Sequence, residues 1–207
     1  MKTWSRKKRW LLGLAVSLGL LLLTVVGAFL VIGHFNLFGA HQHCSKGLGL
    51  LLRQYASNHD GNYPVHTNGF GDALLLLITE DDHANLRHLV APGDDGKMLL
   101  ECLEKNLDVP EEKCSRIYIQ GLSETNGDDG VALVFDAYPT PGGDHFRRPW
   151  GKPIRDVVMA SGSVEFIPEM RWPAFAQDQI ERLVRLGRER RELEKLFGVN
   201  SSADSKK

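Results

Sequence analysis

The strongest candidate for metal chemistry is the run His41-Gln42-His43-Cys44. Imidazole nitrogen and thiolate sulfur are ligands that Zn²⁺ prefers, and a closed zinc site needs four of them. On a helix, His41 and Cys44 share a face because they are three positions apart, whereas His43 points elsewhere. Two more ligands would have to come from distant parts of the chain. We therefore expect a solvated helix with Cys44 packed inward.

A second candidate is the acidic turn that contains Asn126, Asp128 and Asp129, whose side-chain oxygens suit Ca²⁺. Calcium takes six to eight oxygen ligands, and this turn supplies about three or four. An ordinary acidic turn explains the same residues. We therefore expect no cofactor and keep calcium as the alternative.

Motifs for covalent chemistry are missing from the sequence, which has no nucleophile elbow, no phosphate-binding loop and no HExxH run. Ser161-Gly162 reads instead as a two-residue hairpin turn in which glycine supplies a positive φ. We expect a protein that is not an enzyme. A metal-dependent enzyme using His41, His43 and Cys44 is an alternative.

Charge divides the chain into three unlike parts. The first ten residues hold five basic groups and no acidic one, and residues 11–33 hold no charge. The remainder has 20 basic and 26 acidic residues, a net charge of −6. An acidic main domain argues against nucleic-acid binding, so no such partner is expected.

The uncharged run predicts a membrane anchor. Residues 11–32 would form a helix about 33 Å long, enough to cross a hydrocarbon core of roughly 30 Å. Its anchoring positions include Leu11, Leu20, Val25 and Ile32. The basic residues keep the N-terminus in the cytoplasm under the positive-inside rule. A cleaved signal peptide is the alternative, but its apolar core would be shorter and would end at a small-x-small site.

These features predict a single-pass membrane protein, and the resemblance given below implies that the membrane is the bacterial inner membrane. Its predicted parts are a cytoplasmic basic tag (1–9), a transmembrane helix (10–33) and a periplasmic domain. Residues 37–58 continue as an amphipathic helix, because apolar residues recur there at spacings of three and four. Short helices are expected over 72–79, 82–90 and 98–107.

The pattern then changes to a period of two, which predicts strands over 115–120, 131–137, 155–160 and 163–167. A charged helix follows over 171–197, with a disordered tail over 198–207. We expect the charged face of that helix to be solvated; a face that binds a partner or the membrane surface is the alternative. The predicted fold class is α+β.

Cys102 and Cys114 enclose a loop of eleven residues between a predicted helix and a predicted strand. In an oxidising periplasm this pair predicts a disulfide, which would contribute roughly 3 kcal/mol on the chain-entropy estimate. Two buried thiols are the alternative. Cys44 would remain unpaired.

Three segments resemble pilin-like families. CSKGLGLLLRQYASNHDGNYP (44–64) is similar to the pattern C-x-x-N-L-K-Q-I-G-L-A-L-x-x-Y-A-x-D-N-x-G-x-Y/F-P. CSRIYIQGL (114–122) resembles C-S-Y-x-Y-x-x-G-L, and VVMASGSVEFI (157–167) resembles the closing hairpin V-L-F-x-D-G-H-V-E-F-I. The resemblance implies a type IV pilin-like or type II secretion pseudopilin-like protein. Its long N-terminal helix, transmembrane in one half and amphipathic in the other, would pack on an antiparallel meander within a domain over 34–170.

The sequence departs from the processed pilins. It has no Gly-Phe cleavage site and no glutamate early in the apolar helix, and Ser161 and Ser163 replace the hairpin's Asp and His. These departures favour a permanent anchor. The resemblance implies a structural or adaptor role beside other pilin-like subunits or secretion and pilus assembly proteins, and, as in major pseudopilins, a calcium loop near Asp128. A stand-alone anchored binding or sensing module is the alternative function.

Overall fold

The computed structural model describes residues 17–25, 27, 45–80, 85–126, 128–141 and 152–199. The chain divides into two compact units, Met1–Gly39 and Ala40–Lys207. In the first unit, residues 17–25 and 27 are helical, and the side chains of Leu20 and Val25 are exposed. No helix among the described residues is long and apolar enough to cross a membrane. Leu11, Ile32 and most of the predicted span lie outside the described residues.

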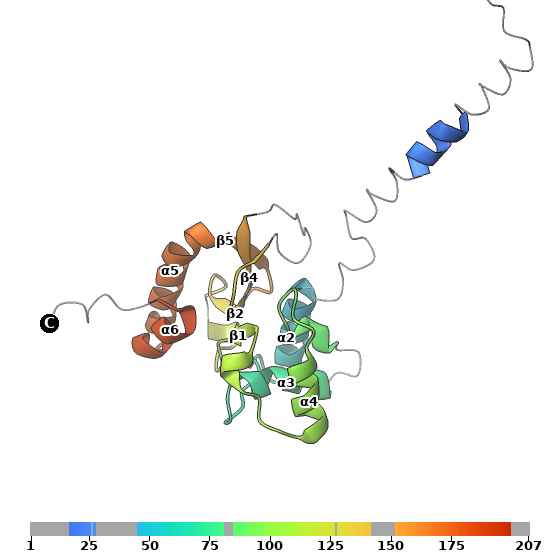
Figure 1. The fold of residues 1–207 in the computed structure, drawn as a ribbon. Coiled ribbons are helices and arrows are strands. Elements are labelled where there is room, and N and C mark those ends of the chain that lie inside the picture. Colours follow the sequence, from blue (N-terminus) through green and yellow to red (C-terminus); the bar gives the residue numbers. More distant parts are fainter. Residues whose placement is uncertain are drawn as a thin grey trace, which may run out of the picture. The chain divides into compact units, whose positions relative to one another are not determined.

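The second unit is built around an antiparallel sheet, which confirms the α+β class (Figure 1). The strands are β1 (Arg116–Tyr118), β2 (Ala132–Asp136), β3 (Thr140–Pro141), β4 (Pro153–Met159) and β5 (Val164–Pro168). β4 is central: β5 pairs with one side of it, and β2 and the short β3 pair with the other. β1 pairs with the outer side of β2. All four predicted strand regions therefore contain a strand.

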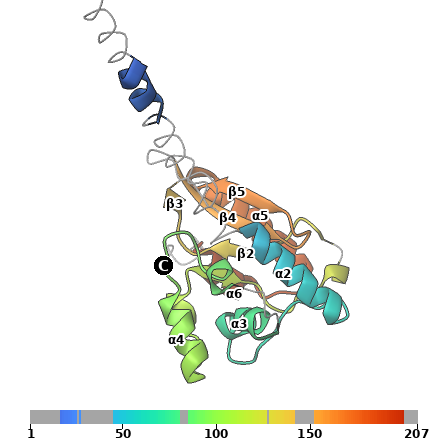
Figure 2. The same cartoon turned by 90° about the vertical axis from the view of Figure 1, so that its right-hand side faces the viewer.

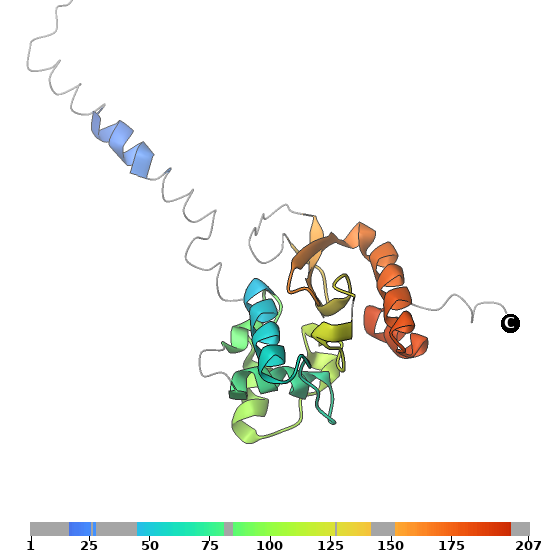
Figure 3. The ribbon, with the colours of Figure 1, turned by 180° about the vertical axis from the view of Figure 1, so that it is seen from behind.

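Helices cover both faces of this sheet, as the opposite views in Figure 1 and Figure 3 show. One side carries α2 (Ser45–Asn58), α3 (Phe70–Glu80) and α4 (Lys97–Lys105). The other side carries α5 (Trp172–Arg185) and α6 (Arg190–Phe197). Because both faces are covered, all five residues of β2 are buried, whereas a half-exposed strand would alternate.

Helix α2 lies against the sheet (Figure 2), and its buried residues lie along one face. Leu48, Leu52 and Ala56 recur every four residues and are fully buried. This confirms the part over 45–58 of the amphipathic helix predicted for residues 37–58; residues 37–44 lie outside the described residues. Helix and hairpin approach closely at Gly49. A Cβ at this position would lie 3.0 Å from the Gly162 carbonyl oxygen and 3.3 Å from Val158 Cγ1.

The predicted two-residue hairpin turn is wrong, because the loop between β4 and β5 has three residues, Ala160 to Gly162. The Gly162 N–H donates to the Met159 carbonyl, and the Met159 N–H donates to the Ser163 carbonyl. With φ of +79° at Gly162, this is a three-residue loop closed by a glycine bulge. Of the predicted helices, 72–79 lies within α3 and 98–107 largely within α4. The described part of 82–90 contains only a 3₁₀ turn, Leu86–His88.

The predicted single C-terminal helix is also wrong. It is broken between α5 and α6, where Gly187 has φ of +88°. The two helices form a packed layer, with Trp172 and Phe197 buried against Phe135 of β2 at ring-centroid distances of 5.3 and 4.5 Å. The charged residues expected to be solvated lie mainly on the outer side. Residues 200–207 lie outside the described part.

Candidate functional site

A cluster of charged and polar side chains lies in the core where α2 begins. Arg116 of β1, Asp136 of β2, Asp156 of β4 and Ser45 of α2 are each at most 2% exposed. The guanidinium of Arg116 lies 3.3 Å from Asp136 Oδ1 through its Nε and donates from Nη2 to Ser45 Oγ at 2.8 Å. Ser45 Oγ in turn donates to Asp156 Oδ2 at 2.9 Å.

Two further contacts of the cluster involve backbone groups. The Asp156 N–H of β4 donates to Asp136 Oδ2 of β2 at 3.2 Å, which links the two strands. Arg116 Nη1 donates to the His88 carbonyl at 2.6 Å. Buried charges are costly unless they are paired and hydrogen-bonded, and these contacts supply the pairing. Because the carboxylates are closed off from solvent, the cluster suits a structural role better than catalysis.

Two of the three segments that resemble pilin-like families contribute a residue to this cluster, and the third begins one residue after Asp156. Ser45 belongs to the first segment and Arg116 to the second, while Asp156 directly precedes the third. A second link joins the first and third segments, because the Tyr63 hydroxyl donates to the Ala160 carbonyl at 2.7 Å. The sequence segments therefore form one contiguous junction between α2 and the sheet.

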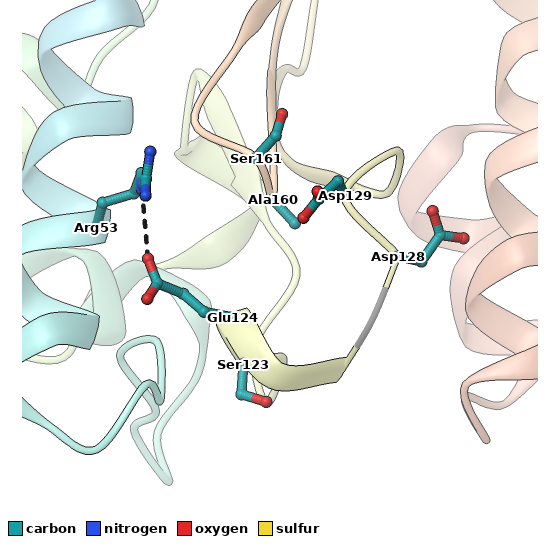
Figure 4. A pocket seen from close by; sticks show the side chains of 7 residues that line it. All are labelled: Arg53, Ser123, Glu124, Asp128, Asp129, Ala160 and Ser161. Atoms are coloured by element: carbon teal, nitrogen blue, oxygen red, sulfur yellow. Dashed lines mark hydrogen bonds and ion pairs between the residues drawn. The ribbon is translucent and has the colours of Figure 1, made fainter.

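A polar pocket of about 290 Å³ lies beside Arg53 of α2, as Figure 4 shows. It is bounded by α2, the loop before β2 and the β4–β5 hairpin. Its lining residues are Arg53, Ser123, Glu124, Asp128, Asp129, Ala160 and Ser161. Arg53 Nε lies 3.3 Å from Glu124 Oε1, so an ion pair spans one side of the pocket.

Tyr63, whose hydroxyl binds the carbonyl of the lining residue Ala160, offers no base to this pocket. Burial, with a smaller contribution from the Glu124 carboxylate, raises the pKa of Tyr63 to about 12. Its phenol therefore stays protonated near neutral pH. The groups that could bind a ligand in the pocket are its carboxylates, Arg53 and the serine hydroxyls.

The calcium candidates are only partly brought together. Asp128 and Asp129 line the same pocket, but Asp128 is turned toward α5, where its Oδ1 lies 3.2 Å from Arg182 Nη1. The same oxygen accepts the Gly130 N–H at 3.0 Å. The Asn126 side chain lies outside the described chain. Within the residues that the structure describes, no group of three or more His, Cys, Asp or Glu side chains could hold a metal ion.

The cysteine pair is present as free, buried thiols, so the predicted disulfide is not formed in this structure. Cys102 Sγ lies 3.7 Å from the Asp108 carbonyl oxygen and Cys114 Sγ lies 3.8 Å from that of Pro110, so each thiol binds the loop between them. Burial raises the pKa of both thiols, that of Cys114 to about 12. Neither is a ready nucleophile. His41, His43 and Cys44 lie outside the described residues.

No protein-family model, curated protein or solved structure matches this chain. Inferences about function therefore depend on the sequence segments and on the geometry of the junction. Sequence reasoning missed the cluster at that junction. The available signal was local: Asp136 and Asp156 are charged residues within or beside otherwise apolar strand runs.

Proposed function

We propose that the chain is a membrane-anchored, pilin-like structural or adaptor protein of a type II secretion or type IV pilus-related system. The observation that carries this proposal is the junction of α2 with the sheet. There the first residue of the helix binds β1 and β4 through Ser45, and Gly49 lies against the hairpin. A helix docked on an antiparallel meander is the arrangement that the resemblance implies.

In this role the protein holds its domain at the membrane so that the domain can contact other proteins. The uncharged segment would hold the chain in the lipid bilayer of the inner membrane, with the domain in the periplasm. The buried cluster would hold the beginning of α2 on the sheet. Loops and strand edges would then contact other pilin-like subunits or assembly proteins. No covalent step is required.

The anchor is tested by the mature N-terminus and by membrane fractionation of the full chain. We expect a start at Met1 or Lys2 and recovery in the membrane fraction. Leu20→Arg with Leu23→Arg should release the chain, because charge in the bilayer core costs several kcal/mol in total. Leu107→Arg, at an exposed position of the domain, is the matched control and should stay membrane-bound. A start within residues 34–44 would contradict the anchor.

The assignment to a secretion or pilus system is tested by cross-linking in intact cells, followed by identification of the attached proteins. We expect a secretion or pilus ATPase complex, its platform protein or another pilin-like subunit. Their absence from a membrane-bound, correctly folded chain would contradict the adaptor role while leaving the anchor intact.

One observation favours the alternative of a stand-alone anchored binding or sensing module. The pocket beside Arg53 is polar, and its Asp129 side chain is exposed and has no ion pair among the described residues. For this alternative, small cationic or hydroxylated compounds should raise the melting temperature. Asp129→Asn should abolish that shift, whereas Asp60→Asn, outside the pocket, should not.

A further inference from the structure

Strand β5 is an edge strand whose outward backbone groups have no protein partner among the described residues. In the β4–β5 ladder, the bulge pair of Met159 with Ser163 fixes which residues bond inward. Because every second residue of an antiparallel strand bonds to the same neighbour, Glu165 and Ile167, like Ser163, direct their N–H and C=O groups to β4. Val164 and Phe166 therefore direct theirs away from the sheet.

The same alternation is visible on the other side of β4. Just after β4, the Ala160 N–H donates to the Val131 carbonyl, and within β4 the Asp156 N–H donates to the side-chain Oδ2 of Asp136, so even-numbered residues here bond toward β2. Odd-numbered residues are left for β5, which agrees with the assignment above. The free edge of β5 thus presents two N–H donors spaced as in a regular strand, and it ends at Pro168, which has none.

A groove of about 730 Å³ runs beside this edge on the α5 side. Its lining residues are Glu165, Phe166, Ile167, Pro168, Arg171, Ala174 and Phe175. The groove is apolar at its centre, with an acidic side chain at Glu165 and a basic one at Arg171. No ion pair joins these two within the described structure, and both residues are exposed.

We propose that β5 pairs antiparallel with β5 of a second copy of this chain, about a two-fold axis at Phe166. In this register the two Phe166 residues exchange N–H···O=C bonds. Each Val164 N–H lies opposite Pro168 of the second copy and can donate to its carbonyl oxygen. Pro168 has no N–H to give in return, so the Val164 carbonyl oxygen receives no bond across this pair, but both outward donors of each strand are used.

The side chains agree with this register. Glu165 of one copy lies opposite Ile167 of the other, at the end of the groove that carries Arg171, so opposite charges approach on both sides of the axis. Phe166, which is 43% exposed, meets its symmetry mate on the α2 face, and aromatic cross-strand pairs are favourable. A register centred on Glu165 would instead place two carboxylates directly opposite each other, which is destabilising.

Charge exchange tests the pairing, which does not depend on the proposed function. The full chain, purified in detergent, is analysed by sedimentation over a range of concentrations. We expect a monomer–dimer equilibrium that Glu165→Arg or Arg171→Glu each weakens about tenfold or more. The double variant Glu165→Arg/Arg171→Glu should regain most of the wild-type affinity. Glu104→Arg, an exposed charge reversal on α4, is the control and should leave the equilibrium unchanged.

A backbone variant tests the hydrogen bonds separately. Val164→Pro removes an outward N–H but none that bonds to β4, so the sheet should persist while the dimer is lost. A photoreactive benzoylphenylalanine at Phe166 should cross-link to residues 164–168 of a second copy. A chain that stays monomeric at about 100 μM, above the roughly micromolar affinity expected of a specific pair, would overturn the proposal. So would a dimer unaffected by Val164→Pro and by both single charge reversals.

Discussion

Ser45 Oγ donates a hydrogen bond of 2.9 Å to Asp156 Oδ2, although the two residues are 111 positions apart. This contact joins the first residue of α2 to the central strand β4. Arg116 shares the same hydroxyl, so helix, edge strand and central strand meet at a single buried oxygen atom.

Breaking the buried ion pair should be costly. Arg116→Met keeps the length of the side chain but leaves Asp136 buried without its guanidinium partner. We expect the free energy of unfolding to fall by about 3–5 kcal/mol in urea denaturation followed by circular dichroism. Arg53→Met removes the exposed pair with Glu124 and should cost less than about 1 kcal/mol. Equal losses in the two variants would contradict the role given to the cluster.

Ser45→Ala should have a smaller effect, because it removes one hydroxyl while keeping all the charges. Asp156 Oδ2 loses the hydrogen bond from Ser45 Oγ, and we expect a loss of about 1–3 kcal/mol in the same measurement. Ser57→Ala, at an exposed position on α2, is the matched control and should change the stability little. A Ser45→Ala variant as stable as the wild type would mean that the hydroxyl is not needed to hold α2.

The close approach at Gly49 should exclude larger residues. Gly49→Val would place methyl groups against the Gly162 carbonyl and Val158, and we expect a loss of about 1–3 kcal/mol from overpacking. Leu50→Val adds the same residue type next in the helix at a position that is 70% exposed. Its effect should stay within about 0.5 kcal/mol. A Gly49→Val variant as stable as the wild type would show that α2 can move away from the hairpin.

The raised pKa of Tyr63 predicts an alkaline loss of stability. The folded state holds the phenolic proton up to pH of about 12, whereas the unfolded chain releases it near pH 10. The contribution of Tyr63 is therefore fully present below pH 10 and is lost as the pH rises toward 12. In Tyr63→Phe, the decline of unfolding free energy over this interval should be shallower than in the wild type. Parallel curves would contradict the raised pKa.

The two buried thiols should react slowly. In a Cys44→Ser background kept reduced, a thiol reagent at pH 8 should label Cys102 and Cys114 far more slowly than in urea, because burial raises the pKa of both. Rapid labelling of the folded chain would contradict this. The disulfide predicted for an oxidising compartment is checked on exported protein, by its mass before and after reduction.

Local periodicity was enough to predict much of the fold. Apolar residues at spacings of three and four predicted the amphipathic helix α2, and alternation located the strand regions. The turn between β4 and β5 was predicted with Gly162 at its positive-φ position, but the loop was predicted one residue too short. A bulge depends on the pairing of the flanking strands, which local sequence does not show. The break at Gly187 was missed, since a single glycine within a charged run is weak evidence against a continuous helix.

The cluster could not be predicted by the same means. Its members are separated by up to 111 positions, and nothing in the spacing of Ser45, Arg116 and Asp156 indicates that they meet. The covering of the second sheet face was also missed. The aromatic contacts of Phe135 with Trp172 and Phe197 arise only once the C-terminal helices fold back. The acidic turn was predicted as a unit, but its Asp128 binds Arg182 of α5, which lies 54 positions away.

The position of Ser45 has a mechanical consequence. Tension that reaches the domain from its N-terminal side acts on the first residue of α2, and Ser45 is bound directly to Asp156 in the middle of the sheet. The pull is therefore transmitted to β4 and β1 before it can unwind the helix turn by turn. The domain would resist such a force as one body, until the polar contacts at that single hydroxyl give way.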